Sequence, residues 1–150
     1  MSSSVPLLSP AQLRAALDLR DLSDPAAGPH AIQILTGRVA AALARTWSCE
    51  VRWCRGPRIV PVADNYDRLG YAPGAITREA RYTRYVSASR MLRSHSTAMV
   101  PPALRRLARR PGGHDVLLAC PGMVYRRDAI DWQHTGTPHQ LDLWRSPAGR

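Results

Sequence analysis

Hydrophobic positions recur at helical spacing in two segments near the start of the chain. Residues 10–19 predict a first helix with Leu13, Ala16 and Leu17 on its apolar side, and Ser9-Pro10 is typical of a helix start. Residues 30–47 predict a longer helix. Its expected buried positions are Ile32, Leu35, Val39, Ala42 and Leu43. The Pro-, Gly- and Asp-containing stretch between the two helices predicts a linker over residues 21–29.

Short alternating or apolar runs predict strands in the middle of the chain. These runs cover residues 50–54, 58–62, 82–86, 91–93 and 115–119. Residues 98–110 predict a further helix, which Ser96 or Thr97 can cap. Its leucines would pack inward, whereas its arginines would face water or RNA.

The last part of the chain predicts two antiparallel strands with many polar residues. The strands cover residues 120–128 and 139–144, and a loop of about ten residues joins them, which is longer than a hairpin turn needs. Because strand side chains alternate, Arg126 and Asp128 project from one face. A guanidinium suits a phosphate, and a nearby carboxylate accepts hydrogen bonds. This pattern favours a ligand site, with a solvated hairpin as the alternative.

Together these elements predict an α+β fold, with a mixed, mainly antiparallel sheet flanked by helices. A chain of 150 residues suits one main domain able to bury about 70% of its unfolded surface. We place an N-terminal helix and linker in residues 1–29 and the main domain in residues 30–150.

The formal net charge is +10, and it comes entirely from arginine because the chain has no lysine. A basic protein favours polyanions such as RNA or ATP. However, the absence of lysine and phenylalanine, with abundant Ala, Arg and Pro, also indicates a GC-rich coding bias. The charge therefore supports nucleic-acid binding only weakly.

Neither a membrane span nor a disulfide framework is visible in the sequence. No apolar run approaches the ~20 residues that cross a bilayer, and no secretory leader follows Met1, so we expect a cytoplasmic protein. The odd number of cysteines, Cys49, Cys54 and Cys120, gives no paired framework. A zinc site would need further ligands, and we expect none.

Three motifs occur in a specific order. The last hairpin contains Tyr125-Arg126-Arg127-Asp128, then Asp131-Trp132-Gln133-His134, then His139-Gln140-Leu141-Asp142. Upstream lie Met91-Leu92-Arg93-Ser94-His95-Ser96-Thr97 and, earlier, Gly56-Pro57 followed by Asp64-Asn65-Tyr66-Asp67-Arg68-Leu69. In order and spacing, residues 30–145 resemble class II aminoacyl-tRNA synthetases, in the form of the phenylalanyl-tRNA synthetase alpha subunit. The hairpin resembles the second signature motif of that class.

The resemblance implies an enzyme that activates an amino acid with ATP, together with Mg²⁺, and transfers it to tRNA or another carrier. Arg126 would be catalytic and bind the α-phosphate, where negative charge gathers in the transition state. Asp128 would bind the adenine end of ATP. His134 would lie near the phosphates, unless it is an exposed loop histidine.

The resemblance also implies an amino-acid site. His95 and Thr97 would approach the substrate, although a structural role for His95 has equal weight. Gln140 and Asp142 would hold its α-ammonium group; Asp142 is shorter than the glutamate of the family, which puts the identity of the amino acid in doubt. Arg93 would be a second phosphate contact or a paired surface arginine.

The helix and strand near the start correspond to the first signature motif, which builds the dimer interface in the family. For a complete domain the resemblance implies a homodimer, with Pro57 or Pro61 near the active site of the partner; the alternative is an ordinary helix and strand that cover the sheet. Nothing resembling the third motif follows before Arg150, so the resemblance implies a partial catalytic domain. The alternative function is a non-catalytic module that binds tRNA or another polyanion.

Overall fold

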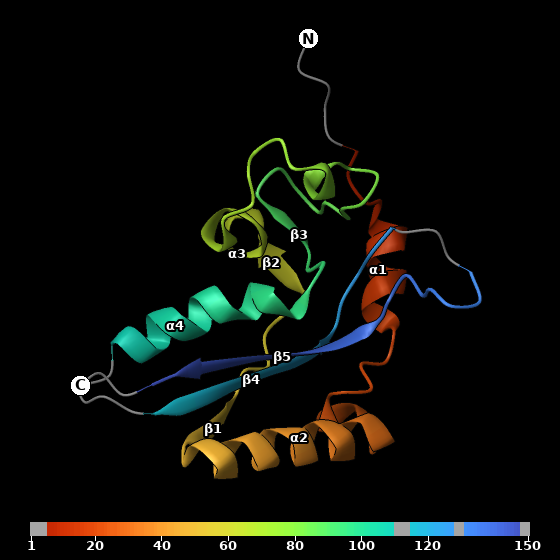
Figure 1. The fold of residues 1–150 in the computed structure, drawn as a ribbon. Helices are drawn as coiled ribbons and strands as arrows, with labels where there is room; N and C mark the ends of the chain where they lie inside the picture. The colour runs from red at the N-terminus through yellow and green to blue at the C-terminus, as the bar shows by residue number, and fades with distance from the viewer. Residues whose placement is uncertain (1–5, 110–114, 128–130, 148–150) are drawn as a thin grey trace.

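The computed structural model describes residues 6–109, 115–127 and 131–147. Helices α2 and α4 cover opposite faces of a sheet formed by β1, β4 and β5 (Figure 1). The helices are α1 (Pro10–Asp18), α2 (Ala31–Trp47), α3 (Val62–Asn65) and α4 (Val100–Ala108). The strands are β1 (Glu50–Trp53), β2 (Ile59–Pro61), β3 (Arg90–Leu92), β4 (Val116–Met123) and β5 (His139–Ser146). Short 3₁₀ turns are η1 (Pro25–Ala27), η2 (Asp67–Leu69), η3 (Ile76–Arg78) and η4 (Ser96–Met99).

Strand β4 is the centre of the larger sheet. It pairs with β1 in parallel and with β5 antiparallel, and all eight of its residues are buried. Its apolar composition follows from this position, because a strand covered on both faces needs no polar side. Strands β2 and β3 form a separate antiparallel pair. The predicted α+β class with mainly antiparallel pairing is confirmed.

Beyond β4 the chain stays extended and joins the two sheets. The N–H groups of Val124 and Arg126 donate to the carbonyls of Pro138 and Gly136, at 2.9 and 2.8 Å. The N–H of Tyr125 points to the other side and donates to the carbonyl of Arg93 at 2.9 Å. The segment that carries Arg126 is therefore paired on both sides.

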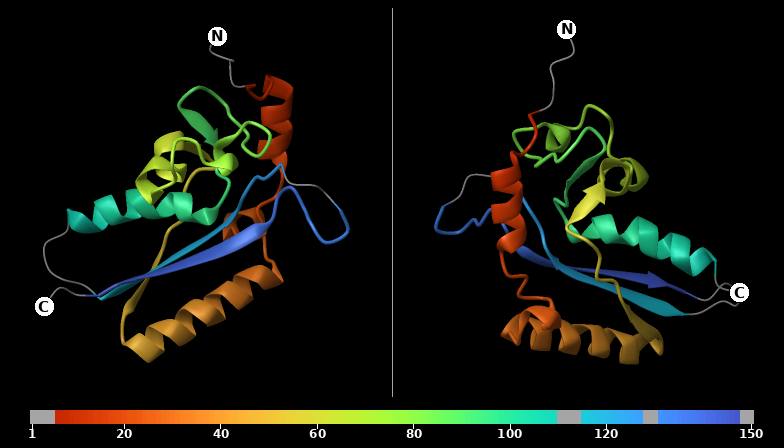
Figure 2. Two further views of the ribbon diagram at one scale, coloured as in Figure 1. Left: turned by 45° about the horizontal axis from the view of Figure 1, so that its top comes forward. Right: turned by 180° about the vertical axis from the view of Figure 1, so that it is seen from behind.

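Helix α1 packs beside this extension, as Figure 2 shows from two directions. It begins with a capping box, in which Ser9 Oγ accepts from the Gln12 N–H and Gln12 Oε1 accepts from the Ser9 N–H. The Tyr125 hydroxyl donates to the carbonyl of Ala16 at 2.9 Å, and both residues belong to one core cluster. The predicted helix is confirmed, but Leu17 is exposed rather than packed.

Helix α2 begins at its predicted position and half-buries the expected Ile32, Val39 and Leu43, but its fully buried positions are not the expected ones. Its buried residues are Thr36 and Ala40, whereas Leu35 is 62% exposed and Ala42 is also exposed. Thr36 can be buried because its hydroxyl donates to the carbonyl of Gln33 at 3.2 Å. The expectations that Leu35 and Ala42 are buried are wrong.

Two predicted elements differ from the structure. Residues 82–86 form no strand; Tyr85 makes only isolated bridges, to Leu7 and Met91. The helix expected over residues 98–110 is α4, preceded by η4, and neither Ser96 nor Thr97 caps it. Its first turn contains Pro101 and Pro102, which are tolerated there because these positions need no backbone donor.

The structure describes residues on both sides of the domain boundary expected at residue 29. The boundary itself stays a prediction. No helix within the described ranges is long and apolar enough to cross a membrane.

Candidate functional site

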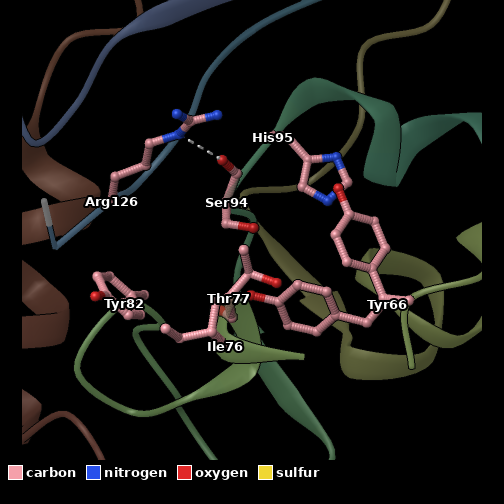
Figure 3. Close-up of a pocket in the computed structure, with 8 residues that line it drawn as sticks. Tyr66, Ile76, Thr77, Tyr82, Ser94, His95 and Arg126 are labelled. Carbon is pink, nitrogen blue, oxygen red and sulfur yellow. Dashed lines mark hydrogen bonds between the residues drawn. The ribbon is translucent and has the colours of Figure 1, made fainter. Parts of the chain in front are cut away.

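A cavity of about 310 Å³ lies between the segment that follows α3, the turn before η4 and the extension of β4 (Figure 3). It is lined by Tyr66, Tyr71, Ile76, Thr77, Tyr82, Ser94, His95 and Arg126. Two residues predicted for the site, His95 and Arg126, are therefore brought to one cavity from different elements. The size lies at the lower end of the range for small-molecule sites.

Asn65, at the end of α3, holds the turn that contains Ser94 and His95. Its Nδ2 donates to Ser94 Oγ at 2.9 Å, and its Oδ1 accepts from the Ser94 N–H at 3.1 Å. Its backbone carbonyl lies 2.9 Å from His95 Nε2. Asn65 is fully buried. The position of His95 is thus fixed by a residue for which the sequence indicated no site role.

The surroundings of His95 favour the neutral imidazole. Burial lowers the pKa of His95 and the charge of Arg126 lowers it further, while the Asn65 carbonyl and the charge of Asp142 act in the opposite direction. Because a carbonyl only accepts hydrogen bonds, Nε2 must carry the proton that faces Asn65. The neutral ring then has a lone pair on Nδ1 and can accept a hydrogen bond.

Arg126 supplies the cation of the cavity. Its Nε donates to the carbonyl of Ser94 at 3.3 Å, the bond drawn in Figure 3. Its own carbonyl accepts from Arg84 at 3.0 Å. A guanidinium held in this way can present planar donors to a carboxylate or a phosphate.

Tyrosines form much of the remaining wall. Tyr66 and Tyr71 meet edge to face at 5.3 Å between ring centroids, and Tyr71 lies 5.7 Å from the His95 ring. The Tyr66 hydroxyl is already bound, to the carbonyl of Thr77 at 2.8 Å and to Thr83 Oγ1 at 2.6 Å. Asn65-Tyr66 belongs to a motif that carried the family resemblance, and this motif was the signal that could have found both residues.

Gln140 and Asp142 lie on β5, near the cavity but not in its lining. Gln140 Oε1 accepts from the Ser96 N–H at 3.0 Å, directly after His95 in the chain. Asp142 is opposite Cys120 in the sheet, and its negative charge acts on His95. Their roles toward an amino acid stay predictions.

The other predicted site residues are not gathered here. Thr97 lies in η4 and is not part of the cavity lining. His134 is in an exposed loop, where its Nδ1 lies 2.7 Å from Asp131 Oδ1 and its side chain is 62% exposed. Asp131 also accepts from the N–H groups of Gln133 and His134, which makes a local turn. Asp128 lies outside the described residues.

Arg93 is neither a phosphate contact of this cavity nor a surface arginine. Its side chain is buried, and it donates to the carbonyls of Met123 and Gly56, both at 2.9 Å. It also pairs with the buried Asp21 at 3.5 Å. Arg93 therefore ties the loop after β1 and the N-terminal segment to β4.

The side chains of the described residues do not form a metal-binding cluster. Among residues 6–109, 115–127 and 131–147, no three His, Cys, Asp or Glu side chains come close enough together to hold an ion. The cavity instead offers one guanidinium, one neutral imidazole and tyrosine rings. This set of groups suits an anionic ligand with an apolar or planar part.

The sequence model described as tRNA synthetases class II core domain (F) matches residues 23–146. The chain is 32% identical over 88 residues to the phenylalanine–tRNA ligase alpha subunit of Prochlorococcus marinus, covering 59% of this chain and 24% of that protein. It is 29% identical over 128 residues to the alpha subunit of Streptomyces avermitilis, covering 79% and 33%.

A solved structure has a similar fold. The pyrrolysyl-tRNA synthetase PylSc of Desulfitobacterium hafniense matches with a TM-score of 0.51 and 14% identity, over 75% of this chain and 38% of that chain. The chain spans about a fifth to a third of the length of the curated relatives that it matches. Since the family match extends over most of the sequence, the chain belongs to the class II aminoacyl-tRNA synthetase core-domain family.

Proposed function

We propose that the chain takes part in ATP-dependent activation of an amino acid as its adenylate, for transfer to tRNA or another carrier. The observation that carries this proposal is the meeting of Arg126 and His95 in one cavity. Both come from segments that resemble motifs of the family, and the chain is similar to phenylalanine–tRNA ligase alpha subunits.

In the proposed reaction the carboxylate of the amino acid attacks the α-phosphorus of ATP, and pyrophosphate leaves. Negative charge gathers on the α-phosphate oxygens, so a fixed cation lowers the barrier. Arg126 would supply this cation, and its hydrogen bond to Ser94 would hold it before the substrate arrives. The neutral His95 adds no second positive charge, and its Nδ1 could accept a hydrogen bond from the substrate.

The remaining assignments support the same reaction. Gln140 and Asp142 would bind the α-ammonium group from the edge of the cavity, with Thr97 nearby. His134 would contact ATP from the loop, and Asp128 would bind the adenine end of ATP. Mg²⁺ would be held largely by the ATP phosphates and by water, since the described residues offer no cluster of ligands for it; bound there, it would neutralise phosphate charge.

We also propose that the protein is a homodimer that uses α2. The exposed apolar residues Ile34 and Leu35, each 62% exposed, suit an interface better than a surface in water. Light scattering at several protein concentrations tests this proposal. Ile34→Lys should shift the protein toward the monomer, and a wild-type protein that stays monomeric at high concentration would contradict it.

Amino-acid-dependent exchange of pyrophosphate into ATP tests the function directly. Arg126→Ala should lower the exchange rate by a factor on the order of 100 or more, as expected when one charge-stabilising donor is lost. Arg127→Ala is the matched control, because Arg127 is exposed and its Nη1 donates to the carbonyl of Ala80 at 3.1 Å. Equal exchange in both variants would refute the role of Arg126.

A second candidate function is polyanion binding without catalysis. It is favoured by the formal charge of +10 and by Arg106 and Arg109, which lie exposed on α4 and just after it. In this case tRNA should bind with a steep salt dependence while pyrophosphate exchange is absent. Arg106→Gln together with Arg109→Gln should then lower both the affinity and the salt slope.

A further inference from the structure

Two cysteines lie side by side on neighbouring strands of the central sheet. Trp53 is paired with Ala119 in the parallel ladder of β1 and β4, and the Cys54 N–H donates to the Ala119 carbonyl at 2.8 Å. The ladder therefore continues by one step, which puts Cys54 directly opposite Cys120. Directly opposed residues of neighbouring strands point to the same face.

The spacing of the strands suits a bond between the two sulfur atoms. Neighbouring strands lie about 4.7–4.9 Å apart, and disulfides form at Cα separations of about 4.4–6.8 Å. Both cysteines belong to one buried cluster beneath α4, together with Met99 and Ala103. All three cysteines of the chain are unpaired in the structure.

The two thiols differ in their chemical surroundings. Hydrogen bonding to the Cys120 thiol and the charges of Arg106 and Arg52 lower the pKa of Cys54, against the effect of burial. The same interaction with Cys54, together with burial, raises the pKa of Cys120. The positive charges beside Cys54 favour its thiolate, which makes Cys54 the better nucleophile of the pair.

Of this pair, Cys54 is also the thiol that a small reagent can reach. It lines two clefts of about 260 and 340 Å³, and Arg106 lines both of them. Cys54 retains 8% exposure, whereas Cys120 has none. Cys54 is therefore the more accessible of the two thiols to a molecule of the size of hydrogen peroxide.

We propose that Cys54 and Cys120 are a peroxide-reactive thiol pair that closes to a disulfide between β1 and β4. The Cys54 thiolate attacks one peroxide oxygen and breaks the O–O bond; Cys54 becomes a sulfenic acid, and the leaving hydroxide takes a proton to give water. The Cys120 sulfur then attacks the Cys54 sulfur and displaces the hydroxyl, which leaves as water with the Cys120 proton. Two thiols lose two electrons, and one peroxide is reduced to two waters.

The test is brief treatment of the full chain with hydrogen peroxide, then alkylation of the remaining thiols and mass spectrometry. We expect two of the three thiols to become unreactive, a mass loss of two hydrogens before alkylation, and a Cys54–Cys120 cross-linked peptide. Dithiothreitol should restore all three thiols. Three alkylated thiols, or a cross-link that contains Cys49, would overturn the proposal.

Two variants separate the roles of the sulfur atoms. Cys120→Ser should stop the reaction at the sulfenic acid of Cys54, which dimedone traps, whereas Cys49→Ser should behave as the wild type. The wild-type protein provides a readout that does not depend on any variant folding. Its fastest alkylation should map to Cys54 and should rise with pH; equal rates for Cys49 and Cys54 would argue against a selective site.

Discussion

Asn65 and Ser94, 29 positions apart, bind each other through two hydrogen bonds: amide Nδ2 to hydroxyl Oγ, and backbone N–H to amide Oδ1. The backbone carbonyl of Asn65 adds a third bond, to the ring of His95. A short helix after β2 therefore sets the position of one wall of the cavity. The wall depends on one buried amide.

Replacing Asn65 with alanine should lower the free energy of unfolding by about 2–4 kcal/mol, because the Ser94 N–H loses its partner inside the protein. Ser94→Ala removes the hydroxyl that accepts from Asn65 Nδ2 but keeps the other two bonds, so it should cost less, about 1–2 kcal/mol. Urea denaturation of both variants measures the difference. A cost for Ser94→Ala as large as that for Asn65→Ala would mean that the amide does not organise the turn.

Gly122 allows the guanidinium of Arg93 to lie directly against β4. A Cβ at position 122 would collide with the Arg93 guanidinium, which cannot move away without losing the carbonyls of Met123 and Gly56. Gly122→Ala should therefore destabilise the protein by about 2–3 kcal/mol or more.

Gly37 provides the matched control. It lies inside α2, and a Cβ there meets nothing within 4 Å. Gly37→Ala should stabilise the protein by about 0.5–1 kcal/mol, since alanine favours a helix interior. Thermal unfolding should show opposite shifts for the two substitutions, and shifts of the same sign would contradict the packing at Gly122.

Acid should weaken the fold through His139. Burial lowers the pKa of His139, and nearby positive charges lower it further against the effect of Asp21. In the neutral ring Nε2 accepts from the Leu22 N–H at 2.9 Å. Because the pKa of His139 is lower in the folded than in the unfolded protein, its contribution to the free energy of unfolding is complete above the unfolded pKa of about 6.5. This contribution is lost as the pH falls through the folded pKa.

Urea midpoints at pH 8, 6.5 and 5 measure this loss. His139→Gln keeps an acceptor for Leu22 but cannot be protonated, so its midpoint should fall less between pH 8 and 5. Part of the slope should remain, because burial also lowers the pKa of His95. An unchanged slope in His139→Gln would remove His139 as a source of acid sensitivity.

The orientation of α2 can be checked by two substitutions in one helix. Leu35→Lys should change the free energy of unfolding by no more than about 0.5 kcal/mol, because Leu35 is exposed. Ala40→Leu should cost about 1–3 kcal/mol, because Ala40 has no exposed surface. Denaturation at concentrations where the chain is monomeric measures both, and the reverse order would support the face predicted from the hydrophobic pattern.

Long periodic elements were predictable from the sequence, and short ones less so. The helices that became α1 and α2 and the final hairpin follow from local spacing and turn residues. The buried face of α2 does not follow from the spacing, because the hydroxyl of the buried Thr36 finds its hydrogen-bond acceptor within the same helix. The expected strand at residues 82–86 failed for a similar reason: the Tyr85 hydroxyl donates to the carbonyl of Arg78 at 2.7 Å, within a compact segment of turns.

The site was predictable only as separate motifs. Family resemblance pointed to Arg126 and His95, but their meeting in one cavity depends on the pairing of Tyr125 with Arg93 across two sheets. Spacing could not reveal that Arg93 is buried, since its partner Asp21 lies 72 positions away. His134 lies in the loop, as predicted, and the local turn at Asp131 determines its contacts.

The bond between Tyr125 and Ala16 joins residues that are 109 positions apart. During synthesis, α1 leaves the ribosome long before its partner on the extension of β4 exists. We expect α1 to remain undocked until the end of β4 has been made, because loop closure over such a distance comes late in folding. The cavity around Arg126 should therefore be among the last parts of the protein to assemble.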